Sequence, residues 1–303
     1  MTKTQVEVIT SVERRRRWSR MEKERIVAAA IEPGAVASEV ARAAGIDTSQ
    51  LFRSKTMIAF QSSTLHKKPQ PRVPDDVRIY AIGDIHGRAD LLDRLLKRID
   101  ADLAKNLVPQ GIEVFLGDYV DRGPASREVL DRLVERKSTH QTVFLKGNHE
   151  TFLTSFVSNP PILEDWQRLG GLETLMSYGI TPSINAAAPA QARLAVAFGQ
   201  ALPESHRRFL GDLKTSFTCG DYFFVHAGVR PGIPLAKQRE EDLLWIRQEF
   251  LLCEDDFSKI IVHGHTPVLQ PDFHPNRINI DTGAYVTGRL TCLVLETDKT
   301  RIL

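Results

Sequence analysis

The sequence has little cysteine and no long hydrophobic run, and both absences narrow what the protein can be. Its 303 residues include only three cysteines, Cys219, Cys253 and Cys292, which are far apart and outside any CxxC pattern. Such a set predicts neither a disulfide framework nor a thiolate metal site. No apolar run approaches the roughly 18 residues of a membrane helix, and the N-terminus lacks the apolar core of a secretory signal. We therefore expect a soluble, cytoplasmic protein with no membrane partner.

The charges are divided unevenly along the chain. Residues 1–74 carry 14 Lys and Arg against 7 Asp and Glu, whereas residues 75–303 carry 26 against 31. The front segment is therefore basic and the remainder is acidic. An acidic domain can act on an anionic substrate if bound cations dominate the local field.

A polar, proline-containing stretch separates the two parts. Residues 61–76 show no apolar periodicity and hold three prolines, which is typical of a linker. We therefore predict a basic helical segment over residues 1–60, a linker over 61–76 and a catalytic domain over 77–303.

The predicted catalytic domain begins with three strand-loop-helix units. Short apolar runs at 77–82, 114–116 and 143–145 each precede a polar loop and then residues with helical spacing. The helices are expected at 91–99, at 126–136 and from residue 152. Further strands are expected at 222–225, 260–262, 278–280 and 292–295. The pattern predicts an α/β fold with much of the sheet parallel, and residues 158–215 are expected to form helices over the sheet or a cap.

Ionisable residues gather in the loops that follow these strands. The loops read GDIHG at 83–87, GDYVDRG at 117–123, GNHE at 147–150, HAG at 226–228 and HGHTP at 263–267. Loops at the carboxyl ends of strands form active sites in open α/β sheets. Their oxygen and imidazole ligands suit Mn, Fe, Zn, Ni or Co, and they are numerous enough for two ions.

These five motifs, in this order, resemble the metallophosphoesterases of the phosphoprotein phosphatase family, and bacterial members in particular. Pro267 stands where a wider related pattern has a second histidine, as it does in the phosphoprotein phosphatases. The resemblance implies a calcineurin-like fold: a central mixed β-sandwich flanked by helices, in four layers α/β/β/α, here with a small helical N-terminal extension.

The resemblance also implies a set of metal ligands. Two divalent ions, manganese foremost, would be held by Asp84, His86, Asp118, Asn148, His226 and His265. Asp118 would bridge the two ions. A hydroxide held between them would attack phosphorus in line with the leaving oxygen.

Four further residues are implied in catalysis. Arg122 and Arg247 would bind phosphate oxygens, because the planar guanidinium matches two of them. His149 would protonate the leaving alkoxide, with Asp121 orienting its imidazole. Alternatives remain: Arg247 as a charge on a surface helix, and Asp121 as a turn-forming residue. Unless His263 reaches the site, it is expected either to support the site residues from behind or to be a packing residue.

The basic front segment has its own resemblance. Residues 14–53 show helix-turn-helix spacing and resemble the DNA-binding N-terminus of insertion-sequence transposase accessory proteins, which would make nucleic acid a partner. The alternative is a solvated, charged extension.

The motifs lead to three functional hypotheses. The first is a bacterial serine/threonine protein phosphatase that acts on phosphorylated proteins or small phosphoesters. The second is a diadenosine-polyphosphate or other nucleotide hydrolase of the same fold, because fold does not determine substrate. The third is a DNA-binding protein acting through its N-terminal segment.

Overall fold

The computed structural model describes residues 70–182 and 185–303. The predicted segment 1–60 and most of the predicted linker lie outside the described residues. Within the described ranges, no helix combines the length and apolarity that crossing a bilayer requires.

The first sheet has the strand order β10-β9-β1-β2-β3. Strands β1 (Val77–Ile82), β2 (Gln110–Phe115) and β3 (Gln141–Phe144) run parallel to one another. Strand β9 (Cys292–Glu296) pairs antiparallel with the other edge of β1, and β10 (Lys299–Ile302) pairs antiparallel with β9. All six residues of β1 are buried, as expected for a central strand covered on both faces.

The second sheet has the order β4-β5-β6-β8-β7. Strands β5 (Tyr222–Val225), β6 (Ile260–His263) and β8 (Arg277–Asn279) are parallel. The short strands β4 (Ser216–Cys219) and β7 (Asp272–Phe273) close its two edges as antiparallel partners. Apolar side chains of both sheets belong to one core cluster, so the sheets pack face to face.

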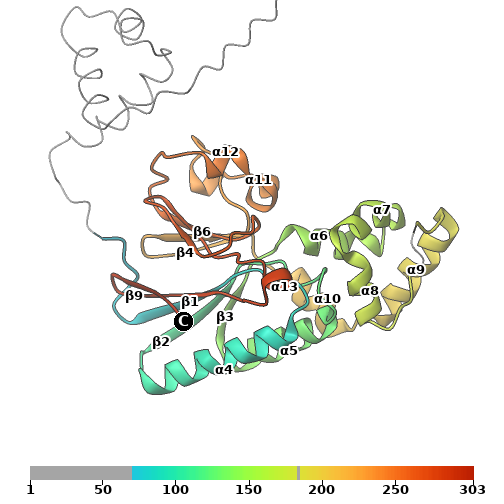
Figure 1. Cartoon of the computed structure of the whole chain (residues 1–303), viewed down its shortest axis with the longest axis horizontal. Coiled ribbons are helices and arrows are strands. Elements are labelled where there is room, and N and C mark those ends of the chain that lie inside the picture. The colour runs from blue at the N-terminus through green and yellow to red at the C-terminus, as the bar shows by residue number, and fades with distance from the viewer. Residues whose placement is uncertain (1–69, 183–184) are drawn as a thin grey trace, which may run out of the picture. The chain divides into compact units, whose positions relative to one another are not determined.

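Helices cover the outer face of each sheet (Figure 1). Helices α4 (Ala89–Lys105) and α5 (Ser126–Thr139) lie against the first sheet, and α11 (Glu240–Trp245) and α12 (Gln248–Leu251) lie beyond the second. Helix α4 buries leucine and isoleucine side chains at helical spacing and leaves its polar face in solvent. The arrangement confirms the predicted four-layer α/β/β/α fold.

Residues 158–215 are mostly helical, as expected. With α6 (Asn148–Phe156), they form the extended helical region at the side of the sandwich in Figure 1. Its other helices are η1 (Pro160–Ile162), α7 (Leu163–Trp166), η2 (Gln167–Leu169), α8 (Gly171–Ser177), α9 (Ala188–Ala201) and α10 (Glu204–Gly211). The fully buried rings of Phe156, Trp166 and Phe198 contact one another, with centroids 5.3 to 6.1 Å apart. The remaining short helices are η3 (Leu235–Lys237) and α13 (Ala284–Thr287).

Two parts of the structure differ from the sequence-based expectation. The last residues of the expected linker pack on the domain: Val73 is fully buried, and its amide donates to the Thr297 carbonyl at 2.9 Å. Edge strands β4, β7 and β10 were not predicted. All four residues of β10 are exposed, so that strand has no buried face to create a hydrophobic pattern.

Candidate metal centre

The polar loops meet at the carboxyl ends of β1, β2, β3, β5 and β6. Their backbone is unusual there, because His86, Asp118 and His265 have φ of 47°, 51° and 65°, in the left-handed region that side chains other than glycine seldom adopt. Such conformations often mark functional sites. At Gly147 a Cβ atom would lie 2.1 Å from Asp118 Oδ1, so only glycine permits this approach.

Two groups of ligand atoms share Asp118. His86, Asp118 and His149 form one group, and Asp118, His226 and His265 form the other, with the atoms of each group within 4.8 Å of one another. All five side chains are buried. A carboxylate common to two adjacent groups is in the position that a bridging ligand occupies.

Hydrogen bonds orient two of these imidazoles. His86 Nδ1 lies 2.9 Å from the Val120 carbonyl oxygen, and His226 Nδ1 lies 2.9 Å from the Leu116 carbonyl oxygen. Because a carbonyl only accepts, each Nδ1 carries the proton, and each Nε2 lone pair is left for a metal.

Acceptor atoms crowd together around Asn148. Its Oδ1 atom lies 2.9 Å from both His226 Nε2 and His265 Nδ1. With Nδ1 of His226 protonated, its Nε2 and the amide oxygen are both acceptors, and a cation would relieve their repulsion. The structure thus brings Asn148 together with both histidines.

Asp84 supplies an independent test of whether cations fit the site. Its Oδ2 accepts the His265 amide at 3.1 Å, but its buried Oδ1 has no hydrogen-bonding partner in the described residues. Burial, followed by the charges of Asp281 and Asp118, raises the pKa of Asp84 well above its ordinary value. A buried carboxylate oxygen without a partner is costly, and a bound cation would satisfy it. The donor set therefore fits divalent ions.

His149 and Asp121 form the expected pair. His149 Nδ1 lies 2.7 Å from Asp121 Oδ2, which also accepts the Trp166 indole N–H at 2.8 Å. The Thr174 hydroxyl donates to Asp121 Oδ1 at 2.6 Å. Burial lowers the pKa of His149, but the charges of Asp118 and Asp121 outweigh burial and raise it above the ordinary value. Asp121 is therefore part of the site in addition to lying in a turn.

The two arginines are held differently. Arg122 Nη2 lies 3.3 Å from His149 Nε2, and the guanidinium carbon is 4.7 Å from the centre of the Tyr285 ring. Arg247 is exposed and lies directly before α12. Burial is the main cause of the lowered pKa of His226 and His265, and the positive charge of Arg247 lowers both values further. Arg247 thus lies near the centre without a fixed partner in the described part of the chain.

Sequence reasoning missed several residues of the centre. Asp281 is buried, which raises its pKa to about 6, and Tyr285 contacts His86 as well as Arg122. The carboxylate of Glu150 accepts the amides of Gly147, Asp118 and Tyr119. The DTGAY segment at 281–285 follows a predicted strand, as the other polar loops do. That placement could have identified Asp281 as a residue of the site.

His263, by contrast, lies outside both ligand groups. It is fully buried and its ring meets Phe250, with centroids 4.9 Å apart. Its ring thus packs against an apolar side chain, while its buried Nε2 has no hydrogen-bonding partner within the described residues.

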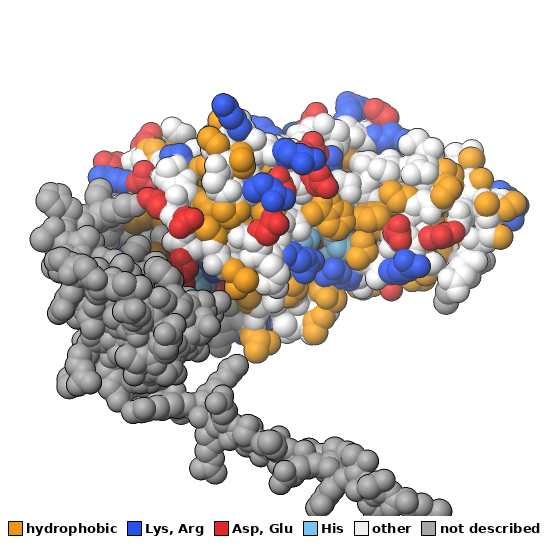
Figure 2. Space-filling model, turned by 90° about the horizontal axis from the view of Figure 1, so that it is seen from above, with side chains coloured by type: hydrophobic (Ala, Val, Ile, Leu, Met, Phe, Trp, Pro, Cys, Tyr) orange, Lys and Arg blue, Asp and Glu red, His pale blue; other side chains and the backbone are white. Residues whose placement is uncertain are grey.

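Trp245 forms part of the rim of the centre. It is 40% exposed, and its ring meets those of His265 and Phe152 edge to face, with centroids 6.2 and 5.9 Å apart. On the face shown in Figure 2, histidine side chains reach the surface beside basic and hydrophobic ones. An aromatic ring is therefore available next to a candidate ligand.

Comparison with known proteins agrees with this geometry. The family model described as calcineurin-like phosphoesterase matches residues 77–293, most of the chain. The chain belongs to the calcineurin-like phosphoesterase family. A second model, described as transposase, matches residues 12–72, in line with the predicted helix-turn-helix; nucleic-acid binding there stays a prediction.

The similar curated proteins of this phosphoesterase family include nucleotide hydrolases. The asymmetrical bis(5'-nucleosyl)-tetraphosphatase PrpE of Geobacillus sp. strain WCH70 is 30% identical over 241 residues, covering 71% of this chain and 89% of that protein. Its counterpart from Anoxybacillus flavithermus is 27% identical over 230 residues, covering 70% and 88%. A crystal structure named as a candidate diadenosine tetraphosphatase shares the fold, with a TM-score of 0.53 at 21% identity and coverage of 75% and 92%.

Proposed function

We propose that this phosphoesterase is a two-metal hydrolase whose substrates are dinucleoside polyphosphates. The observation that carries the proposal is that the buried Asp118 lies beside His86 in one group of ligand atoms and beside His226 and His265 in another. This choice reverses the order of the sequence-based hypotheses, in which the protein phosphatase came first. Support for it comes from the relatives, which are named as nucleotide hydrolases.

In this proposal the six ligands act as the family resemblance implies. Asp84 and His86 would hold one cation, Asn148, His226 and His265 would hold the other, and Asp118 would serve both. When bound, two such ions supply Lewis acidity toward phosphate oxygens and activate water. Manganese leads the candidate metals because its ligand preference includes carboxylate and amide oxygens.

The remaining residues bind phosphate and transfer a proton. Arg122 and Arg247 hold the oxygens of the reacting phosphoryl group, which carries negative charge through the transition state. His149 Nδ1–H donates to Asp121, which leaves Nε2 beside Arg122, the residue proposed to bind the phosphate, where a protonated ring can give its proton to the leaving oxygen. The raised pKa of His149 favours the protonated form that this role requires.

Trp245 favours a substrate that contains a nucleobase. Bases stack on exposed aromatic side chains with about 1–3 kcal/mol per base. Its ring lies against His265, so a base stacked on its exposed part would be near the reacting phosphates. A phosphoserine side chain offers no such planar group.

The pairing of His149 with Asp121 favours the second candidate, a serine/threonine protein phosphatase. An alkoxide leaving group must be protonated, whereas a nucleoside phosphate leaves more readily without a proton. A buried imidazole with a 2.7 Å carboxylate partner suits that need.

The test compares kcat/KM for diadenosine tetraphosphate, a phosphoserine peptide and p-nitrophenyl phosphate. The protein is stripped with a chelator and reloaded with Mn, Ni, Co, Zn or Fe singly. We expect the dinucleotide to exceed the peptide by at least about tenfold, an energy of about 1.4 kcal/mol. Preference for the peptide by the same factor would establish the second candidate.

Variants at Trp245 sharpen this comparison. Trp245→Leu should lower kcat/KM for the dinucleotide by about tenfold, because stacking is lost, and leave kcat/KM for the phosphoserine peptide, which has no planar group at that position, nearly unchanged. Trp245→Phe is the matched control that retains a ring and most of the rate. Equal losses on both substrates with Leu would contradict a stacking role.

A further inference from the structure

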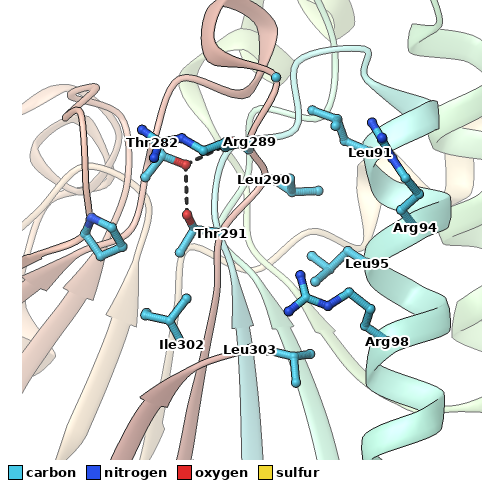
Figure 3. A pocket seen from close by; sticks show the side chains of 12 residues that line it. Leu91, Arg94, Leu95, Arg98, Thr282, Arg289, Leu290, Thr291, Ile302 and Leu303 are labelled. Carbon is cyan, nitrogen blue, oxygen red and sulfur yellow. Dashed lines mark hydrogen bonds between the residues drawn. The ribbon is translucent and has the colours of Figure 1, made fainter.

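A cavity of about 440 Å³ lies between α4, the 282–291 segment and β10. Figure 3 shows side chains from all three elements around it. It is separate from the metal centre: none of the candidate metal ligands lines it. Its volume is within the range of small-molecule sites, about 300–1,000 Å³.

Its lining combines positive charge with hydrocarbon. Arg94, Arg98 and Arg289 line the cavity, and no acidic residue does. Leucine and isoleucine side chains make up much of the rest, among them the buried Leu91 and Leu95 of α4. A ligand that matches both parts has a negative group attached to an apolar body.

The three guanidinium groups are not equally available. Arg94 contacts Asp90 at 3.2 Å, and Arg289 donates to the Leu269 carbonyl. The exposed side chain of Arg98 has neither a hydrogen bond nor an ion pair within residues 70–182 and 185–303. It is therefore the cation best placed to receive an anion.

The polar groups at the opposite wall have partners already. The hydroxyls of Thr282 and Thr291 lie 2.8 Å apart, as the dashed line in Figure 3 shows, and Thr282 also donates to the Arg289 carbonyl at 3.0 Å. The polar groups on that wall therefore need no hydrogen bonds from a ligand. The charge of the ligand would be matched by the arginines alone.

We propose that this cavity binds a small organic anion with an apolar body, such as a medium-chain carboxylate. The carboxylate pairs with Arg98, and the hydrocarbon covers Leu290 and the exposed Ile302. Charged hydrogen bonds to a guanidinium are about twice as strong as neutral ones, and burial of the methylene groups adds a favourable hydrophobic contribution.

The cavity is connected to the metal centre through the 281–291 segment. Thr282 faces the cavity, while its neighbour Asp281 is buried beside the candidate ligands. Further along, Tyr285 holds Arg122 on its ring, and Gly288 and Arg289 return to the cavity. A ligand that restrains this segment therefore changes the positioning of Arg122, and through it the KM for a phosphate ester. The proposal does not depend on which substrate the enzyme prefers.

Binding is measured by titration calorimetry of the full-length, metal-loaded protein with octanoate. Saturating inorganic phosphate occupies the metal centre during the titration. Octanol and acetate are the control ligands. Octanol keeps the hydrocarbon chain without the carboxylate, and acetate keeps the carboxylate without the chain. We expect octanoate to bind at least about tenfold more tightly than either probe. Equal binding of all three, or no binding of octanoate, would overturn the site.

A pair of variants on α4 tests the location. Arg98→Gln should weaken octanoate binding by about tenfold or more, because it removes the free guanidinium. Lys97→Gln removes the same charge from the neighbouring exposed position, which does not line the cavity, and should stay within about twofold. Equal losses in both variants would mean nonspecific attraction and would contradict the proposal.

A kinetic measurement tests the connection. Octanoate should change the KM for p-nitrophenyl phosphate in the wild type and in Lys97→Gln, and lose this effect in Arg98→Gln. A KM that octanoate leaves unchanged, despite measured binding, would overturn the connection and leave the binding site standing.

Discussion

Two clusters in this molecule contain the same kinds of side chain, but only one suits a metal. The candidate centre has Asp118 surrounded by histidines, and a second group consists of Asp100, Glu113 and His140. In the second group Arg136 donates to both carboxylates, with its Nε 2.9 Å from Glu113 Oε2. The positive charge that balances these two carboxylates is thus supplied by Arg136, without a metal ion.

In the candidate metal centre, no arginine or lysine of the described residues makes an ion pair with a carboxylate. Within the described residues, Asp84 Oδ1 and His265 Nε2 are buried without partners, and no arginine makes an ion pair with Asp118. A bound cation would supply the positive charge that these carboxylates lack. The comparison shows that unsatisfied ligand atoms, more than the mixture of residue types, distinguish a metal site from a buried ion pair.

The largest expected effect is at the shared carboxylate. Asp118→Asn should lower kcat/KM by about a thousandfold or more, because a neutral amide cannot offset two cations. Metal content, measured by plasma mass spectrometry, should fall with it. A variant that keeps half of the wild-type rate would remove the bridging role.

Replacement of the proton donor should depend on the leaving group. His149→Ala should slow alkyl phosphates by about 10²–10⁴-fold, because their leaving oxygen needs a proton. The loss on p-nitrophenyl phosphate should be much smaller. Similar losses on both classes would count against a general acid.

In the second cluster we expect an effect on stability instead. Glu113→Gln removes the carboxylate charge that pairs with the largely buried Arg136. The change should reduce the free energy of unfolding by about 3 kcal/mol. Metal content and kcat should not change. Asp100→Asn, at a half-exposed carboxylate, is the control and should cost less than about 1 kcal/mol. Loss of metal from the Glu113 variant would erase the distinction between the clusters.

The smallest effects concern the front of the chain. Deleting residues 1–69 should leave kcat/KM within about twofold, because every residue assigned to the centre lies beyond them. Deleting residues 1–74 also removes the buried Val73 and should cost about 1.5 kcal/mol of stability. Chemical denaturation of the two truncations measures the difference. Equal stability would show that Val73 contributes nothing.

Most of the candidate centre could be predicted because each of its residues lies in a short sequence motif that can be recognised without the structure. Asp84 and Asp118 each sit in a glycine-flanked loop that follows a buried apolar strand. Parallel strands bring such loops to one edge, so separate motifs could be assembled without knowing the contacts. The main helices could be predicted for the same reason, since apolar spacing is a local property.

By itself, the sequence determined the class of fold, the order of the strands that carry ligands and the chemical character of the centre. Only the tertiary structure decided that Trp166 and Thr174 would hold Asp121, that Tyr285 would lie under Arg122, and that Arg136 would fill the second cluster. These contacts join segments that are distant along the chain. No local pattern records them, because packing of whole elements determines which distant side chains meet.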